Sequence, residues 1–102
     1  MYTLEITDSA ESDLDQITDY LGTTLANPQA AISFLDELDR VSLMLGEMPG
    51  MYPLCADPRL AELGYRKAIV RAYILIYEID EPAKTIRVLR FFHESENYSS
   101  KL

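Results

Sequence analysis

The spacing of hydrophobic and polar residues changes along the chain, and each spacing predicts one kind of element. Residues 2–6, YTLEI, alternate between apolar and polar side chains, which is typical of a short, half-buried strand. Over residues 10–25 apolar side chains recur every three or four positions and predict a helix, with Asp8 as its expected N-cap. A second helix is predicted from Asn27, a good N-cap followed by proline, to a stop at Pro49.

The second half of the chain favours strands. After a proline-containing loop with a helical turn over 58–63, three apolar runs follow: RKAIVRA, YILIYEID and TIRVLRFFH. Simple alternation along the last run places Val88 and Arg90 on one face and Leu89 and His93 on the other. The tail after it is polar, and we expect it to be loosely held.

The order strand, helix, helix, strand, strand, strand predicts an α+β fold. We expect one domain over residues 1–102, with a small, mostly antiparallel β-sheet and an N-terminal helical hairpin packed on one face. The other face of the sheet should then meet water or a partner. The turn between the first two of the three later strands falls at Arg71–Ala72, and neither residue favours a turn.

Charge narrows the class of partner. The net charge is −8 and the isoelectric point is near 4.4, which argues against avid, non-specific binding to nucleic acid. The charge is uneven, because residues 1–51 contain ten acids and one base whereas residues 52–102 contain seven acids and eight bases. A local positive patch on the predicted sheet is therefore compatible with an acidic whole.

Composition also indicates in which cellular compartment we expect the protein. Cys55 is the only cysteine, so the chain cannot form an internal disulfide or a cysteine-based zinc cluster, and it suits a reducing cytosol. No apolar run approaches 18 residues, and the first residues lack the basic and apolar regions of a secretory signal. We therefore expect a cytoplasmic protein without a membrane partner.

Several motifs in order resemble the RelE/ParE superfamily of toxins from bacterial type II toxin–antitoxin systems. These are AESDLDQITDYL, NPQAAISFLDEL, LGEMPGMYP, LGYRKAIVRAYILIYEID and RVLRFFHESENY, which together cover nearly the whole chain. The resemblance implies a toxin that a cognate antitoxin wraps and neutralises. RelE-like members cut messenger RNA in the ribosome, as endoribonucleases that need no metal or other cofactor, whereas ParE-like members poison DNA gyrase.

The cations of the sheet are the candidate phosphate ligands. Arg66, Lys67, Arg71 and Arg90 carry the charge that RNA cleavage would need around its crowded phosphate, and an arginine fork binds two oxygens at once. Arg66 matches the arginine that opens the central strand in the resembled family. The same cations would also suit the acidic segment of an antitoxin. The alternative is a solvent-exposed sheet face on which they pair with acids of neighbouring strands.

Two residues near the end of the chain are candidates for proton transfer. His93 is the only histidine, and it stands where many RelE-like relatives have a histidine or tyrosine. Tyr98 follows in the tail and would stack on a base or donate a proton. The alternative for His93 is an ordinary polar residue at the rim of a strand.

The target stays open between three functions. His93 favours a ribosome-dependent mRNA endoribonuclease, which is the first expectation. Each phosphate that a cation neutralises adds affinity for RNA, so a chain with few cations is poorly suited to bind it. The shortage of cations therefore favours a gyrase inhibitor without its own catalysis, or a non-toxic member that only binds antitoxin.

Overall fold

Three α-helices and a four-stranded sheet make up the computed structural model, which describes residues 1–102. The sheet order is β1-β4-β3-β2, with β1 parallel to β4 and the other pairs antiparallel. The elements are β1 (Thr3–Ile6), α1 (Asp8–Asp19), α2 (Pro28–Glu47), α3 (Pro58–Glu62), β2 (Arg66–Val70), β3 (Tyr73–Asp80) and β4 (Thr85–His93), with a π-helical turn at Tyr20–Thr24 and a 3-10 turn at Tyr98–Lys101. The predicted α+β fold is confirmed.

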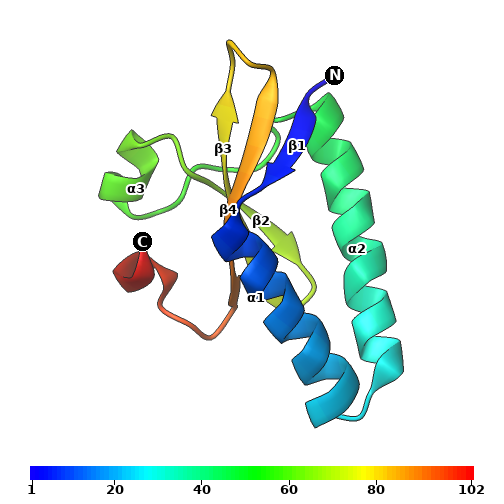
Figure 1. Ribbon diagram of the computed structural model, residues 1–102. Coiled ribbons are helices and arrows are strands. Elements are labelled where there is room, and N and C mark those ends of the chain that lie inside the picture. The colour runs from blue at the N-terminus through cyan, green and yellow to red at the C-terminus, as the bar shows by residue number, and fades with distance from the viewer.

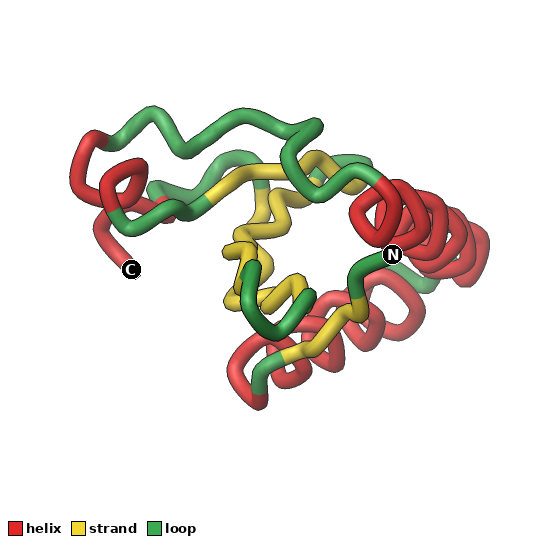
Figure 2. Tube along the Cα trace, turned by 90° about the horizontal axis from the view of Figure 1, so that it is seen from above, coloured by secondary structure: helices red, strands yellow, loops and turns green.

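The two long helices form the predicted hairpin. They lie on one side of the sheet, joined through the π-helical turn, while α3 and the C-terminal turn lie on the other side (Figures 1 and 2). Asn27 caps α2 as expected, since its side chain accepts a hydrogen bond from the backbone of Ala30 at 3.2 Å. The expected cap of α1 was wrong by one residue. Thr7 has extended backbone angles and accepts from Ala10 N, so Asp8 is already helical.

Apolar side chains fill both faces of the sheet. The larger core joins both helices to alternate residues of the strands, including Phe34, Val41, Leu45, Leu75 and Tyr77. A smaller cluster covers the opposite face and consists of Cys55, Leu60, Ile74, Ile76 and Phe92, with Tyr98 and Leu102 packed on it. The expectation that the second face meets water or a partner was therefore wrong, because α3 and the tail of the same chain cover it.

The polar C-terminal tail packs against the fold, contrary to the expectation that it is loosely held. Arg59 of α3 donates hydrogen bonds to the backbone oxygens of Ser99 at 2.8 Å and Leu102 at 2.9 Å. The ring of Tyr98 stacks on Phe92 with the centroids 6.1 Å apart. The polar tail thus packs through Tyr98 and Leu102 and through the hydrogen bonds that Arg59 donates to its backbone. The spacing of apolar residues in the sequence does not reveal these contacts.

A β-bulge in β4 overturns the predicted alternation. Tyr77 pairs with Val88 and Ile76 pairs with Arg90, so Leu89 is an extra residue on β4. Val88 therefore faces the helices, while Arg90 belongs to the opposite face, on which Arg87 also lies. Beyond the bulge it is His93 that faces the helices, opposite Tyr73.

Glycine at position 64 is required by its backbone. Gly64 follows α3 with φ +82°, in the left-handed region, and an added Cβ would meet nothing within 4 Å. We expect Gly64→Ala to lower the free energy of unfolding by about 1–2 kcal/mol through backbone strain alone. Gly50→Ala, with no positive φ and equal space, should change it by less than about 0.5 kcal/mol. Equal losses in urea denaturation of the two variants would contradict this.

Candidate functional site

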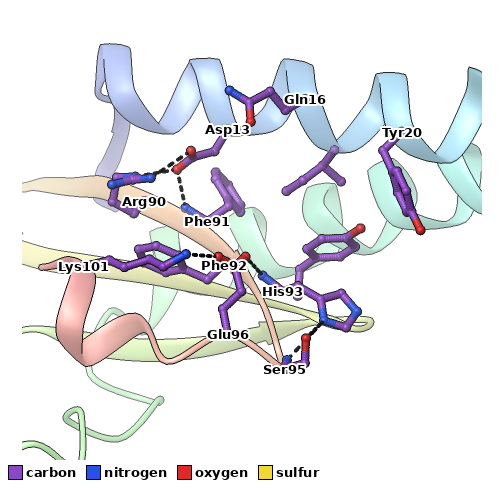
Figure 3. A pocket seen from close by; sticks show the side chains of 12 residues that line it. Asp13, Gln16, Tyr20, Arg90, Phe91, Phe92, His93, Ser95, Glu96 and Lys101 are labelled. Atoms are coloured by element: carbon purple, nitrogen blue, oxygen red, sulfur yellow. Dashed lines mark hydrogen bonds and ion pairs between the residues drawn. The ribbon is translucent and has the colours of Figure 1, made fainter. Parts of the chain in front are cut away.

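A groove runs between α1, the end of β4 and the C-terminal tail (Figure 3). Its volume is about 590 Å³. Polar side chains of α1 form one wall and those of the tail form the other. The lining residues are Asp13, Gln16, Ile17, Tyr20, Tyr73, Arg90, Phe91, Phe92, His93, Ser95, Glu96 and Lys101.

Part of the groove follows an edge of β4 that no strand covers. β1 pairs only with residues 85–88, so the end of β4 beyond the bulge lacks a neighbour on that side. Carboxylates occupy this edge instead: Asp13 accepts from the backbone N–H of Phe91, and Glu96 accepts from that of His93, both at 2.9 Å. Acidic side chains therefore satisfy the edge and discourage strand pairing there.

Arg90 and Asp13 form the central ion pair of the groove. Arg90 Nε lies 2.7 Å from Asp13 Oδ2 and a terminal guanidinium nitrogen lies 3.1 Å from Oδ1, which is a two-pronged contact. The guanidinium also lies over the ring of Phe92, 4.9 Å from its centroid. The hydrogen bonds that Arg90 donates to Asp13 raise the pKa of Arg90 above its ordinary value, although burial opposes this.

A second ion pair joins the tail to itself. Lys101 Nζ lies 2.7 Å from Glu96 Oε2, while the other carboxylate oxygen accepts from the backbone of His93. The Lys101 ammonium, followed by that backbone N–H, lowers the pKa of Glu96. Both charged pairs of the groove are thus internally balanced.

His93 is held by its neighbours in the tail and in the core. Its Nδ1 accepts a hydrogen bond from the backbone N–H of Ser95 at 3.1 Å and lies 2.7 Å from the Ser95 hydroxyl. The ring packs edge-on against Tyr73, with the centroids 5.3 Å apart. Since a backbone N–H only donates, Nδ1 acts as an acceptor here, which leaves Nε2 as the ring nitrogen that carries the proton.

Three of the predicted phosphate ligands lie outside the groove. Arg66 donates to the backbone oxygens of Tyr52 at 2.6 Å and Gly50 at 3.4 Å, and so ties the loop after α2 to the sheet. Lys67 lies on the face of the sheet that is turned away from the two long helices, with Nζ 5.8 Å from the centroid of the Tyr98 ring. Arg71 occupies the predicted two-residue turn with φ +57° and is exposed.

Tyr98 also lies away from the groove. It packs on the second face of the sheet, where burial, followed by nearby Cys55, raises the pKa of its phenol. Of the residues predicted from sequence, the groove therefore brings together only Arg90 and His93.

Sequence reasoning missed the partners of these two residues. Asp13 and Tyr20 were not among the predicted site residues, although both line the groove and Tyr20 is 46% exposed. Glu96 and Lys101 were not singled out. The five-residue spacing of this last pair carries no helical or strand signature, and Asp13 is 77 positions from Arg90.

Almost every cation of the chain has an internal partner. Arg66 and Arg59 bind backbone oxygens. Ion pairs with carboxylates occupy five others, namely Arg40, Lys84, Arg87, Arg90 and Lys101. Only Lys67 and Arg71 remain without an acceptor, and Lys67 lies by an aromatic ring. Most cations of the sheet are therefore held by contacts within the fold, and they are not grouped at one place where they could bind a polyanion.

Other kinds of site are not apparent. No three His, Cys, Asp or Glu side chains are grouped so as to hold a metal ion. None of the helices combines the length and the apolar character needed to cross a membrane.

The fold of this chain is similar to that of chains in solved toxin–antitoxin structures and in the structure of an isolated toxin. The chromosomal ParDE system of P. aeruginosa contains a chain with TM-score 0.70 and 22% identity, over 91% of this chain and 96% of that one. The isolated RelE toxin of E. coli gives 0.62 and 18%, over 99% and 94%. The RelBE2 complex of Mycobacterium tuberculosis gives 0.62 and 21%, over 90% and 96%. These likenesses show the shared fold.

Sequence comparison gives the family. The family of ParE toxins of the type II toxin–antitoxin system parDE matches residues 4–98. The chain belongs to this family and is a type II toxin, as the resemblance implied. Among curated protein sequences none matches significantly.

Proposed function

We propose that this protein inhibits DNA gyrase by binding to it, without a catalytic step of its own, and that a cognate antitoxin neutralises it. The observation that carries the proposal is the internal use of the cations. Cleavage of RNA needs free positive charge around the phosphate, and the only arginine in the groove is already neutralised by Asp13. A chain of net charge −8 also gains little from approaching the ribosome, which is rich in phosphate.

The family match supports the same target, since ParE-like members are the gyrase poisons of the superfamily. Structures of related toxins come from toxin–antitoxin complexes, which supports a cognate antitoxin for this chain.

An mRNA endoribonuclease is the second candidate, and one observation favours it. Arg90 and His93 line the same groove, so a cation and a group able to transfer protons lie near each other. Against this, Arg66, Lys67, Arg71 and Tyr98, which were predicted to complete such a site, point elsewhere.

The two candidates predict opposite results in one pair of assays. Purified protein should reduce the supercoiling of relaxed plasmid by DNA gyrase in a dose-dependent way, and its induction without antitoxin should create no new RNA 5′ ends inside translated frames. His93→Ala should keep this inhibition within about twofold, because binding requires no proton transfer. New RNA ends that disappear in His93→Ala, together with unimpaired gyrase, would establish the endoribonuclease instead.

A further inference from the structure

We propose that Arg90 and the backbone N–H of Phe91 form an oxyanion site whose resident occupant is the carboxylate of Asp13. In this view Asp13 is the residue that keeps phosphate groups out of the groove. The inference deepens the proposed function, on which its meaning for toxicity rests, because it identifies what makes the groove unsuitable for RNA.

Three donors converge on the one carboxylate. Arg90 Nε and the backbone N–H of Phe91 both donate to Asp13 Oδ2, at 2.7 and 2.9 Å, and a terminal guanidinium nitrogen donates to Oδ1 at 3.1 Å. A guanidinium fork with an added backbone N–H is the donor set that proteins use to hold carboxylate or phosphate groups of ligands. The site is therefore built for an oxyanion, and helix α1 supplies one.

The donors are held by contacts that do not involve Asp13. The guanidinium lies over the ring of Phe92, and the backbone of Phe91 is fixed by pairing with Leu75 of β3. Removal of the carboxylate should therefore leave the donors in place. It would also leave the charge of Arg90 uncompensated, because the other ion pair of the groove is complete between Glu96 and Lys101.

Space and access are also present. The Asp13 side chain is 13% exposed and that of Arg90 is 32% exposed, and both line the groove. Shortening Asp13 to alanine would connect the donors directly to this hollow, which has room for a phosphate group beside the guanidinium.

The test compares two substitutions on the same helix. Asp13→Ala and Asp15→Ala each remove one negative charge, but Asp15 is exposed and has no side-chain partner. Inorganic phosphate is titrated into each protein while the NMR signals of the Phe91 amide and the Arg90 Nε–H are followed. We expect Asp13→Ala to bind phosphate at least about tenfold more tightly than wild type and Asp15→Ala. Equal affinities in all three proteins would overturn the proposal.

Two further variants make the test decisive. Adding Arg90→Gln to Asp13→Ala should abolish the gained binding, and binding that survives this change would also overturn the proposal. If Asp13→Ala does not fold, Asp13→Ser decides, because serine also removes the carboxylate from the Arg90 and Phe91 donors; no gain over Asp15→Ala would then count against the proposal. The titration contains no gyrase, so its result is independent of the supercoiling assay.

Discussion

Replacing Phe34 with alanine is expected to lower the free energy of unfolding by about 3–5 kcal/mol. Phe34 is fully buried between α2 and the sheet, and its ring packs edge-on against Tyr73 with the centroids 5.2 Å apart. The substitution removes both the buried apolar area and this aromatic contact, and a core around such a substitution relaxes only partly into the space. Urea denaturation of the two proteins measures the difference.

The matched control is Leu43→Ala on the same helix. The Leu43 side chain is 69% exposed, so the change should stay within about 0.5 kcal/mol. A similar loss in both variants would show that α2 contributes through helix stability rather than through packing of its buried face. Because Tyr73 also supports the ring of His93, Phe34→Ala should additionally broaden the NMR signals of His93.

Alkaline pH is expected to weaken the fold through Tyr77. Burial raises the pKa of Tyr77 from its ordinary 10 to about 12, and its hydroxyl donates to Pro49 O at 2.6 Å. The folded state therefore favours the neutral phenol. This contribution is fully present below the unfolded pKa and is lost as pH rises from about 10 to about 12, at a cost of roughly 2–3 kcal/mol.

Tyr77→Phe separates this effect from general alkaline denaturation. The variant should be less stable than wild type at neutral pH by about 1 kcal/mol, since the bond to Pro49 O is lost. Its stability should fall less steeply than that of wild type above about pH 10. Some decrease should remain, because burial also raises the pKa of Tyr73. Parallel pH profiles of the two proteins in urea denaturation would contradict the assignment.

The elements of this fold could be predicted because their signals are local. Asn27 followed by proline began the second helix as expected, and the apolar spacing gave the helical hairpin. The predicted alternation along β4 failed where one extra residue shifted it. The extra residue Leu89 reversed the faces of β4 beyond it, because side chains alternate strictly and a single insertion shifts every later position.

Only Arg90 and His93 of the site were predicted from the sequence, and the structure changes the role expected of them. Arg90 and His93 could be selected by residue type, since few other groups of this chain bind phosphate or transfer protons. Their partners Asp13, Glu96 and Ser95 could not, because nothing in an isolated carboxylate or hydroxyl indicates which distant group it will meet. The same arginine is a phosphate ligand when free and a structural ion pair when held by Asp13.

The sequence by itself determined the order and type of the elements, the toxin superfamily and the shortage of positive charge, because periodicity, motif order and composition are properties of the linear chain. Only the tertiary structure decided how that charge is used. It turned Arg66 toward backbone oxygens, paired Arg90 with a residue 77 positions away and covered the second face of the sheet with the tail. Each of these depends on contacts between distant segments, which form only when the packing of the core brings them within hydrogen-bonding distance.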